Sequence, residues 1–383
     1  MRALALLAVL FVACSTPTTP VPTPQPTREP GTLTVAVLLD LSGPRAPSGQ
    51  AQKNAVQLWI DQPPTSTLKI HVSFVDVAGS DAKLLLAVRR AVVEDRADAL
   101  VIGVPVALEG ALSDAIKVAA VPVLLTLPNA EPAGAPGGAF TFALAPSPDQ
   151  IARAVVGDLV DRSLLQPMLL AGDASHAAAV ERGAIVAELK HRALAIPGAV
   201  SLDTPDGAQR ARAAAAFAKS VVLAGASAPY GDVIRSIPVA AGAPVVYLSY
   251  LTETADVTNL REGSALVTWP GSRTLAFTQF PATTSPSFQQ RFTEKYGAPS
   301  TIAASAYDAL LLIDAAATAT AKELDPERLR ERLEANTFSG IVTDYTFSPS
   351  RHLGFALKDL ALLRWNAQVG RAFVPSQPGE PER

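Results

Sequence analysis

The sequence predicts an α/β protein of two lobes, each built around a doubly wound parallel sheet. Short apolar runs of the kind that form strands buried on both faces alternate with segments whose apolar residues recur at helical spacing. Such strict alternation predicts parallel strands joined by right-handed crossovers. The pattern restarts after a helix at residues 148–162, and a chain of 383 residues exceeds what one core usually serves. Two lobes are therefore expected.

The first strand, loop and helix organise the prediction. Residues 33–39 form the apolar run of a strand, and helical spacing follows Gly49, with Ala55, Leu58 and Trp59 on one face. Polar and turn-forming residues lie between them: Asp40, Ser42, Gly43, Pro44 and Ser48. In such sheets ligands bind outside the carboxyl ends of the strands, near helix N-termini with free N–H groups. This loop is the first candidate ligand contact, although an ordinary connection without a ligand has the same pattern.

The later elements follow in order. Strands are expected at residues 68–77, 97–104, 121–127, 139–144, 167–173, 198–202, 220–226, 243–249 and 264–270. Helices are expected at residues 80–96, 107–119, 148–162, 178–190 and 207–219, and Ser80 or Asp81 suits the N-cap of the first. A loop rich in Pro, Gly and Ala occupies residues 128–138.

Charge and motifs exclude several classes of function. The net charge is −3 and no window carries five like charges, so the sequence predicts no nucleic-acid surface. Phosphate-loop, dinucleotide-binding, zinc-protease and nucleophile-elbow motifs are absent, so a hydrolase has no motif behind it. The histidines lie far apart and lack metal-ligand spacing: His71, His176, His191 and His352. We expect no metal, no cofactor and no enzymatic activity.

Residues 1–13 are typical of an export signal. Arg2 precedes the apolar segment 3–13, which is too short to span a bilayer. The segment ends in Ala13-Cys14-Ser15, which resembles a bacterial lipobox around the only cysteine of the chain. Lipidation of Cys14 predicts an exported protein anchored on the outer face of the cytoplasmic membrane, or in the periplasm or outer membrane. The alternative is a plain secretory signal with an idle thiol.

Residues 14–30 are expected to form a tether behind the anchor. Residues 15–30 carry six prolines and five threonines, a polyproline-type composition that does not pack. At about 3.1 Å per residue the tether reaches up to roughly 50 Å from the membrane. An anchored tether suits a protein that captures something from solution and meets a partner in the membrane.

Five stretches in a fixed order carry a resemblance to a known family. They are VAVLLDLSGPRAPSGQAQKNAVQLWI, ALVIGVPVALEGA, AFTFALAPSPDQIARAVV, FQQRFTEKYGAPSTIAASAYDALLLIDAA and FSGIVTDYTF. Together, from Gly31 to about Phe373, the chain resembles type I periplasmic binding proteins of the leucine/isoleucine/valine-binding family, the solute receptors of ABC importers. In the last stretch Thr343 stands where the family pattern often has Gly.

The resemblance implies two lobes joined by three crossovers, with a small-molecule ligand between them. Lobe one is expected at residues 31–144 plus 271–340, and lobe two at residues 145–270 plus 341–373. The third crossing is expected near 340–344, and residues 374–383 are expected to be a disordered tail. The two lobes are expected to close about a hinge. A ligand favours the closed state only by as much as its affinity for that state exceeds its affinity for the open state.

The resemblance places the candidate ligand contacts on loops at the carboxyl ends of strands. Lobe one contributes Ser42, Gly43, Ser48, Ala107, Leu108, Glu109, Thr126 and Asn129. Lobe two contributes His176, Ser227, Tyr250 and Glu253. Tyr250 is expected at the end of a strand, where a tyrosine stacks on a ligand and donates its O–H. The alternative for Tyr250 is packing at the hinge. For His176 the alternative is an ordinary solvated loop histidine.

Departures from the family pattern keep the ligand open. Residues 107–109 read Ala-Leu-Glu where amino-acid binders of the family supply small hydroxyls, and Tyr250 stands near the position of the carboxylate that holds their α-ammonium. A buried ammonium without a partner costs several kcal/mol, so an amide, a small aromatic or carboxylic acid, or a peptide fragment fits as well as an amino acid. The leading interpretation is a lipid-anchored receptor that delivers a small polar metabolite to an ABC permease. The alternative is a protein-interaction lipoprotein of the same fold with a degenerate cleft, for example one that regulates an envelope enzyme.

Overall fold

The computed structural model describes most of the chain from residue 31 onward. The described residues are 31–43, 45–61, 63, 68–129, 140–225, 244–251, 265–268, 286–297, 299–320, 324–366 and 372–375. They belong to one compact unit, residues 31–383. The predicted signal peptide, Cys14 and the tether lie outside the described residues.

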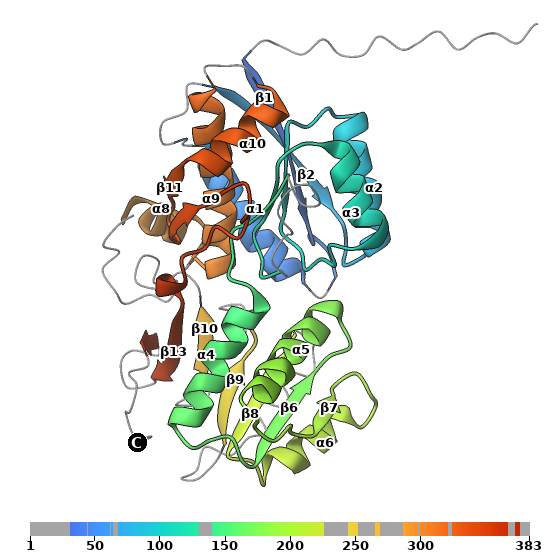
Figure 1. Cartoon of the computed structure of the whole chain (residues 1–383), viewed down its shortest axis with the longest axis vertical. Coiled ribbons are helices and arrows are strands. Elements are labelled where there is room, and N and C mark those ends of the chain that lie inside the picture. The colour runs from blue at the N-terminus through green and yellow to red at the C-terminus, as the bar shows by residue number, and fades with distance from the viewer. Residues whose placement is uncertain are drawn as a thin grey trace, which may run out of the picture. The chain divides into compact units, whose positions relative to one another are not determined.

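The first sheet is parallel and carries helices on both faces (Figure 1). Its strands lie in the order β2-β1-β3-β4-β5: β1 (Thr32–Leu39), β2 (Lys69–Asp76), β3 (Ala99–Ile102), β4 (Val123–Leu125) and β5 (Thr141–Ala143). The helices that follow β1, β2 and β3 are α1 (Ala46–Asp61), α2 (Asp81–Val93) and α3 (Gly110–Ala119).

Strand β1 is buried on both faces, which explains why its sequence is apolar throughout. Val35 and Val37 join the core that contains α1, whereas Ala36 and Leu38 join the core that contains α2 and α3. Successive side chains of a strand point to opposite faces of the sheet. Because helices cover both faces of this sheet, both sets of side chains are buried and no polar alternation is needed.

The second sheet is mainly parallel, with two antiparallel strands at one edge. Its order is β14-β13-β10-β9-β8-β6-β7: β6 (Met168–Gly172), β7 (Ala199–Ser201), β8 (Ser220–Ala224), β9 (Val245–Leu248), β10 (Ala265–Thr268), β13 (Ala361–Asn366) and β14 (Ala372–Pro375). Strand β13 pairs antiparallel with both β10 and β14. The helices of this region are α4 (Pro148–Asp161), α5 (His176–His191) and α6 (Gly207–Ala215).

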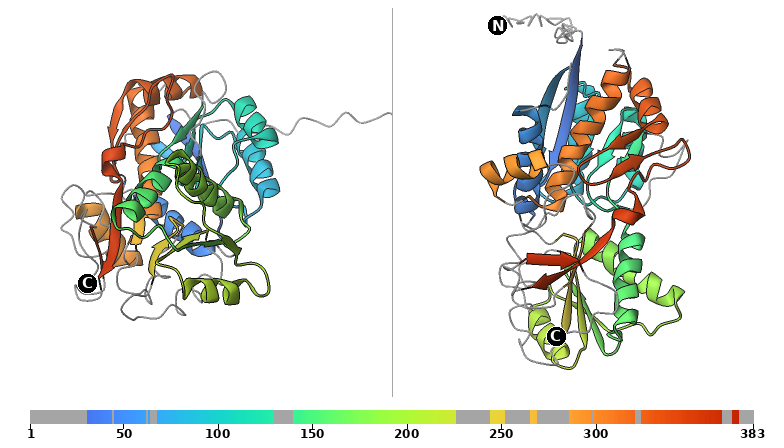
Figure 2. Two further views of the ribbon diagram at one scale, coloured as in Figure 1. Left: turned by 60° about the horizontal axis from the view of Figure 1, so that its bottom comes forward. Right: turned by 90° about the vertical axis from the view of Figure 1, so that its left-hand side faces the viewer.

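The remaining elements return the chain to the first sheet. They are α8 (Pro286–Tyr296), α9 (Thr301–Ala319), α10 (Pro326–Ala335), β11 (Thr337–Ser339), β12 (Asp344–Thr346) and the short helix η2 (Leu357–Asp359). Helix α9 packs along α1, as two views show (Figure 2). Its segment Ile302–Ala319 is long and apolar enough to cross a membrane, but 78% of that segment is buried inside the protein. The burial identifies α9 as a core helix.

Serine side chains begin several of these helices. At α4, the Ser147 hydroxyl accepts from the Gln150 N–H at 3.3 Å and the Gln150 side chain accepts from the Ser147 N–H at 2.9 Å, with Pro148 at the first helical position. This capping box satisfies N–H groups that have no partner inside the helix. Ser80, as expected, and Ser175 cap α2 and α5 in the simpler way.

The predicted fold class, an α/β protein with two parallel-sheet lobes, is confirmed. The differences lie mainly at helix ends. Helix α1 begins at Ala46, so that Ser48 and Gly49 lie in its first turn rather than before it. Helix α6 ends at Ala215, four residues before the expected end, in turns whose N–H groups bond back to the helix. Strand β14 includes residues 374–375 of the expected tail, and residues 376–383 lie outside the described residues.

The third crossing lies further along the chain than residues 340–344, because residues 341–355 pack with the first sheet. Leu353 forms a bridge beside Ala143 of β5. The Ala143 N–H donates to the His352 carbonyl at 2.8 Å, and the Gly354 N–H donates to the Ala143 carbonyl at 3.0 Å. The chain joins the second sheet at β13, so we place the crossing at residues 356–360.

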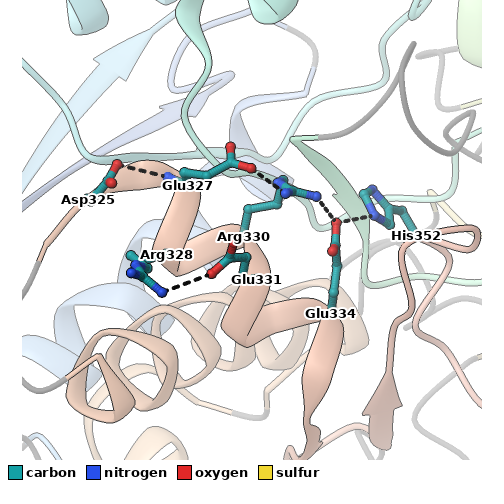
Figure 3. Close-up of polar contacts among 7 residues, drawn as sticks. All are labelled: Asp325, Glu327, Arg328, Arg330, Glu331, Glu334 and His352. Atoms are coloured by element: carbon teal, nitrogen blue, oxygen red, sulfur yellow. Dashed lines mark hydrogen bonds and ion pairs between the residues drawn. The ribbon is translucent and has the colours of Figure 1, made fainter.

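Buried side chains explain why this segment stays with the first sheet. The His352 ring stacks on Phe142 of β5, with 4.3 Å between ring centroids, and its two nitrogens lie 3.0 Å from the Thr141 carbonyl and 3.1 Å from the Glu334 carboxylate of α10. Glu334 also accepts from Arg330 at 2.7 Å (Figure 3). Apolar stacking and polar contacts together hold the segment against β5.

Candidate functional site

The candidate site is the carboxyl edge of each sheet. In the first sheet, Asp40, Gly103 and Thr126 directly follow β1, β3 and β4; in the second, Asp173, Gly225 and Ser249 directly follow β6, β8 and β9. All six residues are buried. Ligands of doubly wound proteins bind outside this edge, so the side chains here decide what each lobe offers.

The loop after β1 is exposed at the predicted contacts Ser42 and Gly43. The Ser42 hydroxyl donates to the carboxylate of Asp76, and this bond is the largest cause that lowers the pKa of Asp76. The N–H groups of Leu41 and Ala78 also donate to Asp76, both at 2.9 Å. The Ser42 hydroxyl therefore links this loop to the end of β2.

A buried acid fixes the position of this loop. Asp40 forms an ion pair with Arg45 at 2.6 Å and accepts from the Gly79 N–H at 2.5 Å. Gly49 lies against the same residue, since a Cβ on Gly49 would overlap the carbonyl oxygen of Asp40. Ser48, another predicted contact, is half-buried in the first turn of α1.

Thr126 and Asn129 are buried and make their hydrogen bonds inside the protein. The Thr126 hydroxyl donates to the Gln52 side-chain oxygen at 2.7 Å, and the Gln52 amide nitrogen donates to the Gly103 carbonyl at 2.7 Å. The Asn129 oxygen accepts from the Val106 N–H at 3.3 Å, and its nitrogen donates to a carbonyl two residues back. Both predicted contacts therefore use their polar atoms to bond neighbouring residues at the carboxyl edge of the first sheet.

The residues before α3 leave its N-terminus without a side-chain cap. Glu109 has the extended backbone of an N-cap, with φ −138° and ψ 166°, but its exposed side chain makes no bond to the helix. Ala107 and Leu108 are half-buried, and Leu108 packs against the core under α2 and α3. Helix N-termini attract carboxylates and carbonyls through their N–H groups and dipole.

The second sheet brings two of its four predicted contacts to the edge, and the others lie outside the described residues. His176 is exposed as the first residue of α5. Tyr250 is buried in the apolar core, and burial, followed by the charge of Glu181, raises the pKa of its phenol. Ser227 and Glu253 fall in segments that the structure does not describe.

Glu181 is a functional candidate that sequence reasoning missed. It lies inside α5, yet its Oε2 accepts from the Gly225 N–H at 3.0 Å and from the Ser249 hydroxyl at 2.8 Å. Burial raises the pKa of Glu181 to about 7, with a further increase from the charge of Asp173; the bonds from Ser249, Gly225 and the Tyr250 N–H oppose it.

Asp173 is the second buried acid at this edge of the sheet, beside Glu181. Its side chain accepts from both the N–H and the hydroxyl of Ser175, the N-cap of α5, and its carbonyl accepts from Arg182 at 2.7 Å. The loops that begin at Asp173 and Ser249 were expected at the edge. Glu181 had no signal, because a glutamate in a helix resembles any solvated helix residue until the fold buries it.

Among the residues that the structure describes, no group of three or more His, Cys, Asp or Glu side chains is arranged to hold a metal ion. The buried acids Asp40 and Asp173 instead bond to backbone or side-chain donors of neighbouring loops. In this part of the chain, acidic side chains organise loops.

Comparison with known proteins agrees with this architecture. The model of the family described as periplasmic binding protein matches residues 32–370. No curated protein matches the sequence.

Solved structures show the same fold at low sequence identity. A solute-binding protein of an ABC transporter from R. palustris, solved in complex with benzoate, has a TM-score of 0.73 at 17% identity and covers 92% of this chain and 97% of its own. A possible leucine/isoleucine/valine-binding protein from Rhodopirellula baltica SH 1 has a TM-score of 0.73 at 15% identity, with 94% and 99% covered. An amino acid ABC transporter substrate-binding protein from Pseudomonas fluorescens Pf-5 has a TM-score of 0.69 at 17% identity, with 92% and 97% covered.

Proposed function

Since the chain belongs to the periplasmic binding protein family, we propose that it is the extracytoplasmic solute receptor of an ABC importer and delivers a small polar metabolite to a permease. The observation that carries the proposal is the family match from residue 32 to residue 370, which spans both sheets and their carboxyl edges. The ligand binds between these two edges, and the protein is a receptor without enzymatic activity.

The ligand offers a carboxylate or carbonyl to lobe one. The support is the N-terminus of α3, where the Glu109 side chain makes no capping bond, together with the internal hydrogen bonds of Thr126 and Asn129. Backbone N–H groups are then the strongest donors on this edge. An amino acid, an amide and a small acid all carry such an acceptor, and the neighbours described above include a benzoate complex and an amino acid transporter component.

A thermal-shift screen tests the proposal. We expect at least one of leucine, leucinamide and benzoate, or a related solute, to raise the melting temperature, because a ligand at 100 times its Kd stabilises the folded state by about 2.7 kcal/mol. If a broad panel of such solutes raises no melting temperature and the purified protein carries no small molecule by mass spectrometry, the receptor proposal is wrong.

A capping variant tests where the solute binds. Glu109→Ser places a hydroxyl where it can accept from an N–H group in the first turn of α3, which the Glu109 side chain does not cap. The variant should therefore raise the melting temperature of the ligand-free protein yet weaken the response to the solute. The matched control is Asp206→Ser, at the N-cap of α6, whose side chain also makes no capping bond. An unchanged solute response in Glu109→Ser would exclude the α3 site while leaving the receptor function standing.

The receptor is held at the envelope by a lipid on Cys14. The support is the sequence around Cys14, with an apolar segment before it and a Pro- and Thr-rich tether after it. Two or three acyl chains, at about 0.8 kcal/mol per buried CH₂, anchor a protein stably. The anchor keeps the receptor at its permease, on the outer face of the cytoplasmic membrane or in the periplasm or outer membrane.

A second candidate is a protein-interaction lipoprotein of the same fold. The observation that favours it is the internal use of Thr126 and Asn129, which leaves few polar side chains on the edge of lobe one. This candidate predicts no response to solutes and capture of an envelope protein by the tethered chain. The solute screen therefore discriminates between the two.

A further inference from the structure

The two sheets repeat the same arrangement of strands around their first strand. The order β2-β1-β3-β4 in the first sheet corresponds to β7-β6-β8-β9 in the second. Helix α1 follows β1, and α5 follows β6. Residues that directly follow equivalent strands are therefore equivalent: Asp40 and Asp173, Gly103 and Gly225, Thr126 and Ser249.

In the first sheet, a side chain from α1 links two of these strand ends. Gln52 is fully buried; its nitrogen donates to the Gly103 carbonyl at 2.7 Å, and its oxygen accepts from the Thr126 hydroxyl at 2.7 Å. Gly103 has no room for a side chain, because a Cβ there would overlap the Gln52 oxygen. The ends of β3 and β4 are thus tied to the helix behind them.

In the second sheet, a side chain from α5 makes the equivalent link. Glu181 accepts from the Gly225 N–H at 3.0 Å and from the Ser249 hydroxyl at 2.8 Å. Gly225 again leaves room for its neighbours, since a Cβ there would lie 2.5 Å from an oxygen of Asp173. The ends of β8 and β9 are tied to α5 as those of β3 and β4 are tied to α1.

We propose that Gln52 and Glu181 are equivalent positioning residues, one in each lobe, and that Glu181 alone makes the edge of its lobe sensitive to pH. An amide cannot take up a proton near neutral pH, whereas a carboxyl group can. That these edges face a ligand rests on the proposed function. The two links themselves rest on the contacts within each sheet.

The surroundings of Glu181 decide whether the stability of the protein rises or falls with pH. Within the described part of the chain, its titratable neighbours are Asp173, which follows β6, and Tyr250, which follows β9. Arg182 on α5 donates to the Asp173 carbonyl. Burial raises the pKa of Glu181 from 4.5 to about 7. The protonated form is therefore favoured in the folded protein, and its stabilising contribution is complete below about pH 4.5 and is lost as the pH rises through about 7.

Thermal unfolding of the ligand-free chain as a function of pH tests the proposal. The wild-type melting temperature should fall between about pH 4.5 and about pH 7, the unfolded and folded pKa values of Glu181, and Glu181→Gln should remove most of this fall. Gln52→Glu, the reciprocal variant, should add a fall of its own, because it places a carboxyl group at the equivalent buried position. Equal pH profiles for wild type and Glu181→Gln would overturn the proposal.

A second measurement covers the case in which Glu181→Gln does not fold. Infrared difference spectra of the wild type, taken between about pH 5.5 and about pH 8, should show the C=O band of a buried protonated carboxyl group disappearing as the pH rises. In Gln52→Glu a second such band should appear. Absence of the band from the wild type at the lower pH would contradict the proposal. Neither experiment contains a solute, so a failed solute screen leaves its outcome unaffected.

Discussion

At the scale of single residues, Asp308 shows how a buried carboxylate connects two distant parts of the chain. It is fully buried on α9 and accepts from the N–H groups of Ile341 and Val342, at 2.6 and 2.8 Å, and from the Tyr345 hydroxyl at 2.9 Å. Gly340 lies against it, because a Cβ there would be 2.6 Å from Asp308 Oδ2. Asp308 and Gly340 belong to the fourth and fifth of the five stretches that carry the family resemblance, so those two stretches are in contact with each other.

Asp308→Asn should destabilise the protein although it conserves size. Both carboxylate oxygens accept hydrogen bonds, so the new NH₂ group would face a donor. Leaving such a buried donor unsatisfied costs on the order of 3 kcal/mol. Urea denaturation measures the loss.

The control for Asp308→Asn is Asp114→Asn, whose exposed side chain lies 4.0 Å from Lys117. This exposed pair contributes at most about 0.5 kcal/mol. Equal losses in the two variants would show that the contacts of Asp308 do not stabilise the fold.

At the scale of elements, the start of α1 depends on close approach to the end of β1. The helix begins at Ala46, and Gly49 lies in its first turn beside the Asp40 carbonyl. Helical spacing in the sequence predicted a later start, because the pattern of apolar residues is visible only after Gly49. Contact with the strand end is the reason why a glycine occupies a helical position here.

Two glycine-to-alanine variants separate contact from helix propensity. Gly49→Ala should destabilise the protein by about 1–3 kcal/mol, since its Cβ would displace the Asp40 carbonyl. Gly183→Ala, in α5, meets nothing within 4 Å, and should stabilise the protein by roughly 0.5–1 kcal/mol. Thermal denaturation of both variants measures the difference; a stabilising Gly49→Ala would contradict the close contact.

At the scale of the whole molecule, the compact unit and the proposed anchor belong to different parts of the chain. Residues 31–383 form a compact unit with both sheets, and β1 begins at Thr32. The predicted lipid attachment at Cys14 precedes this unit. Loss of the lipid should therefore change where the protein is found but not how stably it folds.

Cys14→Ala should release the protein from the membrane fraction without changing its melting temperature. On the lipidation proposal the acyl chains supply the membrane affinity, whereas the compact unit that contains both sheets spans residues 31–383. Fractionation of cells followed by thermal denaturation of the released protein measures both. Cys14→Ala protein that still sediments with membranes would refute lipidation as the anchor.

Particular residues show which features could be predicted from the sequence and which could not. The strand before Asp40 and the helix that begins at Pro148 were placed closely, because buried parallel strands and capped helices leave local patterns. Thr126 directly follows β4, but its hydrogen bond to Gln52 and those of Asn129 to backbone groups were not foreseen. A hydrogen-bond partner far along the chain leaves no local pattern.

The sequence by itself determined the alternation of strands and helices, the α/β class and the family resemblance, since each depends on apolar periodicity and short motifs. Tertiary structure alone decided that residues 341–355 pack on β5, that Asp308 holds their first turn, and that Glu181 and Gln52 occupy equivalent positions behind the two edges. The physical reason is that burial and hydrogen bonding between distant residues arise only when the sheets are assembled, and the same assembly raises the pKa of Glu181 to about 7.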